Sequence, residues 1–286
     1  MVIVDCHAHA WSRWPHGAGV PDPLTRGSAA HLLFEMDACG VGRALLVSAE
    51  IENARDDNDY GARTATAHAG RLSQLVDADS RWSGNYHRAG AAERLRLLVE
   101  QYHPVGVSHY LGPVNDGWLV SSEGLAFFAT AADHGLIVSL AASAPWHADL
   151  REVARRFPPL CLLVNHLGGI ALGPGGGEDV ERRLLGYDDV PNLLAKVSGL
   201  YYGHPRPWEY PYGDRMALVR RFCDAWGPER LVWGSDFPSN LPHVTYRQSL
   251  ELLRGHAPFL SVGDLEAVLG GNVARWLSVG EAVRGA

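Results

Sequence analysis

Lysine is nearly absent from this chain of 286 residues, because Lys196 is the only lysine among 25 basic residues. A GC-rich genome, which favours arginine codons, explains the other basic residues but not the one lysine that remains. Lys196 lies inside the apolar run 192–199, where an unpaired charge is costly to bury. It is therefore a candidate substrate-binding residue, and a structural ion pair is the competing interpretation.

Cysteine, long apolar runs and clustered positive charge are also scarce, and each absence excludes a class of protein. Four cysteines without CxxC spacing indicate neither a zinc ribbon nor a disulfide framework. No apolar run reaches the roughly 18 residues that span a bilayer, and no basic segment followed by an apolar one marks a secretory signal. A net charge of -7 without a basic stripe argues against a nucleic-acid partner. We expect a reduced, cytoplasmic protein that acts on a small molecule and contacts neither nucleic acid nor membrane.

Eight short apolar runs recur along the whole chain and alternate with helix-compatible segments. Most of these runs are continuous, as expected of strands that are buried on both faces. The pattern predicts one distorted (β/α)8 barrel domain over residues 1–286. An open doubly wound sheet is the alternative, but no GxGxxG follows the first run. The predicted strands are 2–7, 43–48, 72–77, 105–110, 136–141, 160–166, 193–198 and 231–236.

Helix signals fill most of the intervals between these strands. The segment 28–40 has Ser28 as its N-cap and Gly40 as its stop. Asn272 reads as the N-cap of the last helix. The glycine-rich stretch 173–177 lacks the Gly-Lys-Ser/Thr ending of a phosphate loop and predicts a mobile loop beside the active site. The other predicted helices are 93–101, 122–134, 146–157, 214–226 and 246–254.

Histidine and aspartate side chains stand where three of the predicted strands end. The first strand runs into Asp5-Cys6-His7-Ala8-His9, the sixth reaches His166 and the eighth reaches Asp236. Alternation along a strand turns His7 and His9 to one face, where two imidazoles can hold a metal ion or an oxyanion. The same alternation turns Cys6 away from His7, toward the outer layer, and Asp5 is expected to orient an imidazole.

Asp236 and His166 are the predicted catalytic residues. A carboxylate that ends an apolar strand needs a cation, a metal or a proton to abstract, so Asp236 is predicted to be the general base and also a metal ligand. Long loops with aromatic and polar side chains follow several strands and predict a pocket for a small polar ring. Apart from Lys196, the predicted substrate contacts are His109, Tyr110, Glu50 and Asn58.

These motifs together resemble the amidohydrolase 2 family and, within it, the lactonase branch, over residues 2 to about 277. The resemblance implies a distorted barrel with its site at the carboxyl-terminal rim, where His7, His9, His166 and Asp236 face the substrate. It rests on five motifs in order: Asp5-Cys6-His7-Ala8-His9, Val164-Asn165-His166-Leu167-Gly168, Lys196-Val197-Ser198-Gly199, Trp233-Gly234-Ser235-Asp236-Phe237-Pro238 and Gly271-Asn272-Val273-Ala274-Arg275.

The chain departs from the wider superfamily on two strands. The fourth strand, 105–110, lacks the lysine that bridges two metals, which argues against a dinuclear centre. The fifth strand, 136–141, lacks the histidine of metal-dependent relatives. One divalent metal, zinc or manganese, held by His7, His9, His166 and Asp236 is one expectation, and a metal-free site is the other. The fourth strand also lacks the arginine that a dicarboxylate lactonase would need.

The expected activity is hydrolysis of a small lactone or related cyclic ester by attack of water, with Asp236 as the base. The alternative is a metal-dependent decarboxylase of an aromatic or unsaturated carboxylic acid, which would release carbon dioxide without consuming water. A third interpretation is a barrel that binds a small ligand without catalysis. The family resemblance also permits a homo-oligomer.

Overall fold

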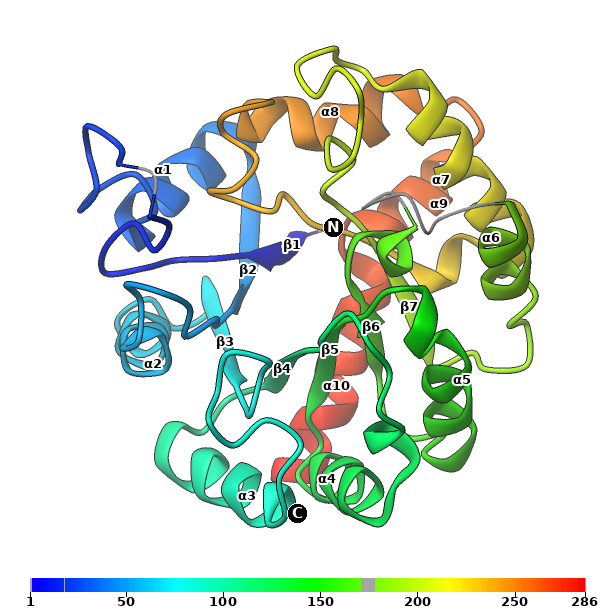
Figure 1. Cartoon of the computed structure of the whole chain (residues 1–286). Helices are drawn as coiled ribbons and strands as arrows, with labels where there is room; N and C mark the ends of the chain where they lie inside the picture. Colours follow the sequence, from blue (N-terminus) through cyan, green and yellow to red (C-terminus); the bar gives the residue numbers. More distant parts are fainter. Residues whose placement is uncertain (1, 18, 171–177, 286) are drawn as a thin grey trace.

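Eight parallel strands form the centre of the molecule in the computed structural model, which describes residues 2–17, 19–170 and 178–285 (Figure 1). Each strand pairs with the next along the chain in the order β1 to β8, which confirms the predicted barrel. The strands are β1 (Ile3–Ala8), β2 (Val41–Val47), β3 (Leu72–Asp77), β4 (Gly106–Tyr110), β5 (Ile137–Ala141), β6 (Leu162–Val164), β7 (Leu193–Val197) and β8 (Leu231–Trp233).

Backbone hydrogen bonds between the first and last strands close the barrel. The N–H of Asp236 donates to the carbonyl of His7 at 2.7 Å, and the N–H of His9 donates to the carbonyl of Phe237 at 2.7 Å. The two partners in each bond lie at opposite ends of the sequence. The closure therefore brings the HxH motif and Asp236 together at the junction of β1 and β8, here called the seam.

Helices surround the strands, as Figure 1 shows. The six predicted helices and the expected last helix are present, and α2, α6 and α9 are additions that the sequence did not indicate. The predicted loop 173–177 lies outside the described residues. Among those residues, no helix combines the length and the apolar character that crossing a membrane requires. The helices are α1 (Ala29–Cys39), α2 (Asp57–Ala67), α3 (Ala91–Tyr102), α4 (Ser122–Asp133), α5 (His147–Arg156), α6 (Glu178–Leu185), α7 (Gly213–Trp226), α8 (Tyr246–His256), α9 (Val262–Glu266) and α10 (Asn272–Arg284).

Two apolar layers hold the barrel together. The outer layer packs strands against the surrounding helices, as Trp233 and Phe222 illustrate. The inner layer joins residues of seven strands to Val273 and Leu277 of α10, which seals the amino-terminal end of the barrel behind the strands in Figure 1. The carboxyl-terminal end is left for polar side chains. The strand residues of the inner layer are Val4, Cys6, Leu45, Leu75, Ile137, Leu163, Leu194 and Val232.

A bulge in β1 corrects the expectation for Cys6. Asp5 pairs with Ala44 and Ala8 pairs with Leu46, so three steps along β1 match two along β2. An extra residue of this kind breaks strict alternation. Cys6 consequently lies in the inner layer, beneath the histidines, and not in the outer layer.

Asn272 is not the N-cap of the last helix, because it is already the first residue of α10. Its side-chain amide donates to the carbonyls of Pro228 at 2.9 Å and Leu231 at 2.8 Å. These bonds satisfy backbone acceptors at the start of β8. The residue thus anchors the strand that leads to Asp236.

Candidate active site

His7, His9 and Asp236 form a buried group at the barrel seam. The Nε2 atom of His7 lies 3.3 Å from Oδ1 of Asp236, and the Nε2 atom of His9 lies 3.8 Å from the same oxygen. One nitrogen or oxygen atom from each residue falls within 4.8 Å of the others. Two imidazoles and a carboxylate at this separation can hold one divalent cation.

The imidazole of His9 is fixed by a backbone carbonyl and by an indole ring. Its Nδ1 lies 2.6 Å from the carbonyl oxygen of Val47, which can only accept, so Nδ1 carries the hydrogen. The lone pair of Nε2 then faces Asp236. Trp11 stacks on the ring at 5.0 Å with an interplanar angle of 8°. Burial lowers the pKa of His9 to about 4, so the ring is neutral at pH 7.

Lys196 contacts His7 inside the barrel. Its Nζ lies 3.0 Å from Nδ1 of His7 and donates to Oγ of Ser139 at 2.7 Å. The Ser139 hydroxyl in turn donates to Oδ1 of Asn165 at 3.0 Å. Burial lowers the pKa of Lys196 to about 7. The competing interpretation, a structural ion pair, is not present among the described residues, because the hydrogen-bond partners of this amine are an imidazole and a hydroxyl and no carboxylate pairs with it.

Asp5 does not orient an imidazole, contrary to expectation. Its carboxylate accepts hydrogen bonds from the backbone N–H of His7 at 3.1 Å and of Ser235 at 2.9 Å, and from the hydroxyl of Tyr246 at 2.9 Å. The bulge in β1 turns this side chain away from the rings. Asp5 therefore ties the seam together from outside, while Lys196 and the Val47 carbonyl contact the imidazoles.

Asp236 is held by a phenol as well as by histidines. The hydroxyl of Tyr201 donates to Oδ2 at 2.5 Å, which leaves Oδ1 toward His7 and His9. Burial alone would raise the pKa of Asp236, but interactions with His166, His7 and His9 outweigh it and hold the pKa below its ordinary range. The carboxylate is therefore ionised at neutral pH and is available as a proton acceptor.

His166 reaches the site from a left-handed turn that follows β6. Its φ is 52°, and Leu167 and Gly168 continue the turn at 52° and 70°. The ring lies 4.8 Å from that of His7, and its Nδ1 lies 2.9 Å from Oγ of Ser198. The turn explains why the predicted strand 160–166 ends early, since β6 stops at Val164.

A cavity of about 310 Å³, here called the His166 pocket, opens beside these side chains. It contains two predicted site residues, His166 and Tyr110. Tyr110 has a buried hydroxyl without a hydrogen-bond partner among the described residues. The pocket has room for a small ring. Its lining consists of Arg81, Tyr110, Leu111, Gly112, Pro113, Ala141, Ala142, Ser143, Asn165, His166 and Tyr202.

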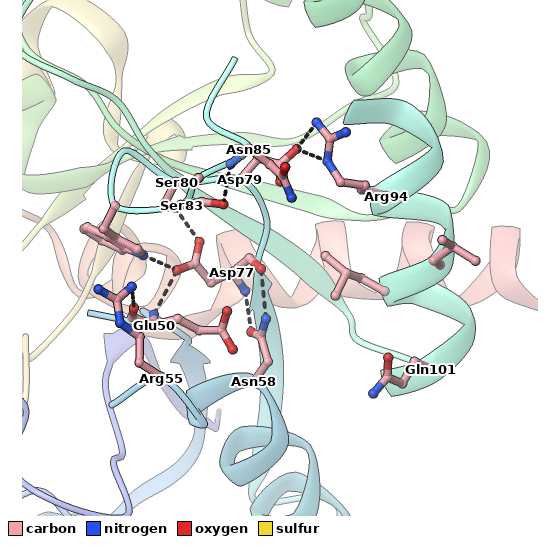
Figure 2. Close-up of a pocket in the computed structure, with 14 residues that line it drawn as sticks. Glu50, Arg55, Asn58, Asp77, Asp79, Ser80, Ser83, Asn85, Arg94 and Gln101 are labelled. Carbon is pink, nitrogen blue, oxygen red and sulfur yellow. Dashed lines mark hydrogen bonds and ion pairs between the residues drawn. The ribbon is translucent and has the colours of Figure 1, made fainter. Parts of the chain in front are cut away.

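Glu50 and Asn58 line a different cavity, of about 450 Å³, which Figure 2 shows between the ends of β2 and β3 and helix α3. The side-chain amide of Asn58 is occupied by the backbone of Asp77, to which it donates at 2.9 Å and from which it accepts at 2.7 Å. Burial, with a contribution from Asp77, raises the pKa of Glu50 to about 7. The substrate-binding roles of both residues stay predictions.

The structure places His109 away from both cavities. Its Nδ1 lies 2.8 Å from the carbonyl oxygen of Ala78, and its ring stacks on Trp118 at 5.2 Å. It also packs 5.8 Å from Phe127 of α4, in the outer layer. The neighbouring Tyr110 points inward, as alternation along β4 requires. The predicted substrate contact of His109 therefore has no support in this arrangement.

Three features of the candidate site escaped the sequence analysis: the bond from Tyr201 to Asp236, the bond between Ser198 and His166, and the position of Arg81 at the pocket. The first two had a usable signal, since Ser198 and Tyr201 stand within or just after the motif 196–199. Arg81 had none, because it follows β3 in a loop whose course depends on its tertiary contacts.

The residues present fit one metal ion. Within the described residues, Nε2 of His7 lies 3.3 Å from Oδ1 of Asp236 but makes no hydrogen bond of good geometry. Nε2 of His9 presents a lone pair to the same Asp236 oxygen. Donors of this type suit a divalent transition metal. The fifth strand contributes Ser139 to Lys196 and supplies no further ligand.

Comparisons with known proteins show which proteins this chain is similar to. The chain is 32% identical over 92 residues to L-fucono-1,5-lactonase of Burkholderia ambifaria, a segment that covers 31% of this chain and 30% of that protein. The segments matched in the curated relatives span less than half of each relative's length.

Solved structures share the fold over nearly the whole chain. An amidohydrolase from Burkholderia multivorans with bound zinc has a TM-score of 0.77 at 20% identity, with 97% of this chain and 99% of that chain covered. A probable 2-pyrone-4,6-dicarboxylic acid hydrolase from Acinetobacter baumannii has a TM-score of 0.75 at 18% identity, with 97% and 100% covered. The family model described as amidohydrolase matches residues 4–279. The chain therefore belongs to the amidohydrolase family.

Proposed function

We propose that this protein hydrolyses a small lactone by direct attack of water. The observation that carries the proposal is the ionised carboxylate of Asp236, buried against two imidazoles and beside a pocket of about 310 Å³. The relative named L-fucono-1,5-lactonase supports a lactone as the substrate class. The family supports hydrolysis as the reaction.

Asp236 is the general base in this scheme. Tyr201 holds one of its oxygens, so the other, which faces His7 and His9, accepts a proton from the attacking water. The oxygen of that water bonds to the ester carbon, and His166 polarises the carbonyl from the pocket side. When the tetrahedral intermediate collapses, the ring C–O bond breaks and Asp236 returns its proton to the departing alkoxide. The product is the open hydroxy acid.

A divalent metal held by His7, His9 and Asp236, zinc or manganese, would act as a Lewis acid and lower the pKa of a bound water. Asp236 has a lowered pKa and is a weak base on its own. The neutral imidazoles of His7 and His9 present lone pairs rather than charge. Activation by a metal therefore fits this site better than unaided histidines do.

The test combines elemental analysis of protein purified without added metal with hydrolysis of sugar and pyrone lactones, before and after a chelator. We expect about one zinc or manganese per chain and hydrolysis that the chelator abolishes and added metal restores. Hydrolysis that survives the chelator in metal-free protein would mean that the histidines and Asp236 catalyse the reaction without a metal. No hydrolysis of any lactone, with carbon dioxide released from aromatic acids, would replace the proposal by the decarboxylase alternative.

A cytoplasmic location and a homo-oligomer stay predictions.

A further inference from the structure

The His166 pocket carries one permanent positive charge, on Arg81. None of the other lining residues is a lysine or an arginine, and none of the described lining residues is acidic. The cavity of Figure 2 differs, because Glu50, Asp77 and Asp79 line it. A positively charged, acid-free pocket in a chain of net charge -7 favours an anionic ligand.

Neighbouring residues hold Arg81 at the pocket although its side chain is exposed. Its backbone N–H donates to the carbonyl of Tyr110 at 2.9 Å. Its guanidinium carbon lies 5.9 Å from the ring centre of Trp82, whose indole N–H donates to Asp77 at 2.7 Å. The backbone bond fixes the start of the Arg81 side chain beside Tyr110, and both residues line the pocket on its β3 and β4 side. His166 lines the β6 side.

No carboxylate of the chain neutralises Arg81 within the part that the structure describes. The nearby carboxylate of Asp79 pairs with Arg94 at 2.7 Å. The guanidinium of Arg81 keeps its fork of N–H donors, which matches a carboxylate in a bidentate arrangement. The loop 111–117, which follows β4, supplies no basic residue. The pocket thus offers one carboxylate-binding group and no second.

We propose that the preferred lactone carries a single free carboxylate, which Arg81 binds while His166 faces the ester carbonyl. The inference rests on the proposed lactone hydrolysis and narrows its substrate class. A neutral sugar lactone would gain no charge-assisted hydrogen bond from the guanidinium, which would stay hydrated. A dicarboxylate would leave its second charge among neutral and apolar side chains, which is costly.

A matched pair of probes tests this choice. D-Galactaro-1,4-lactone and D-galactono-1,4-lactone differ only in a carboxylate or a hydroxymethyl group at C6, and the corresponding glucose-derived lactones form a second pair. We expect kcat/KM to be about 10- to 100-fold higher for the carboxylated member. Arg81→Met should remove most of that preference, chiefly by raising KM for the carboxylated member. Arg81→Lys should keep part of it.

Arg88→Met is the control, because Arg88 is an exposed arginine of the same loop that does not line the pocket. Calorimetry with the Asp236→Asn variant measures binding without turnover. Binding of the carboxylated lactone that depends on Arg81, together with no hydrolysis of either lactone by the parent protein, would support the carboxylate site and contradict the hydrolase. Equal values of kcat/KM for both members of each pair, or no binding of either member, would overturn the carboxylate site.

Discussion

Asp236 is the side chain on which the proposed chemistry depends. Asparagine has nearly the same size but cannot accept the proton of the attacking water. We expect Asp236→Asn to lower kcat by about 100- to 10,000-fold, measured by initial rates of lactone hydrolysis. Asp224→Asn, an exposed change on α7, is the matched control and should keep full activity. Full activity of the Asp236 variant would assign the base to another residue.

Glu50 gives the clearest pH dependence of stability at a single residue. Its pKa is about 7 in the folded protein against an ordinary 4.5, so ionisation of Glu50 destabilises the fold as pH rises from 4.5 to 7. Glu50→Gln removes this penalty. We expect the variant to gain thermal stability over the parent across that window and to keep the gain above pH 7. A difference in Tm between variant and parent that does not change with pH would contradict this assignment.

Single residues also mark how far the sequence can predict the site. His7, His9, His166 and Asp236 were predicted because each ends a buried strand, and parallel strands deliver their ends to one rim. The partners of these residues were harder to predict. Lys196 drew attention by its rarity, but its contact with His7 depends on the barrel's closure, 189 positions away in sequence.

At the scale of the element, the turn after β7 depends on Gly199. Its φ is +60°, and an added Cβ would lie 2.6 Å from Nδ1 of His166. We expect Gly199→Ala to displace His166 and reduce kcat at least about tenfold, in addition to a backbone cost of about 1 kcal/mol. Initial rates and urea unfolding measure the two effects separately.

Gly40→Ala is the matched control for this turn. Gly40 has a φ of +70° at the end of α1, and nothing lies within 4 Å of its added Cβ. It should lose similar stability from the left-handed backbone but keep its activity. Equal losses of activity in both variants would show that the contact with His166 is not what matters.

Strands and helices differed in how well the sequence predicted them. Continuous apolar runs identified all eight strands, because strands of a closed barrel are covered on both faces. Helix α2 was missed because it begins at Asp57 with a polar sequence and little apolar periodicity. The bulge in β1 was missed because it depends on the pairing with β2 and leaves no trace in the residue pattern.

At the scale of the whole molecule, Asp5 joins the two ends of the barrel. It accepts hydrogen bonds from Ser235 and Tyr246, both buried. Asp5→Ala would leave these donors without partners, and we expect a loss of about 2–4 kcal/mol in the free energy of unfolding. Tyr246→Phe, which removes one bond and keeps the ring, should cost about 1 kcal/mol. Urea unfolding of both variants measures the difference, and similar costs would argue against a shared seam.

The same seam has a consequence for synthesis of the protein. A ribosome makes the HxH motif some 230 positions before it makes Asp236. The two halves of the site meet only when β8 pairs with β1. A chain that stops before β8 would therefore have the histidines without the proposed base, and we expect activity only in chains that are long enough to close the barrel. Catalytic activity would in this way require that β8 has been made and has paired with β1.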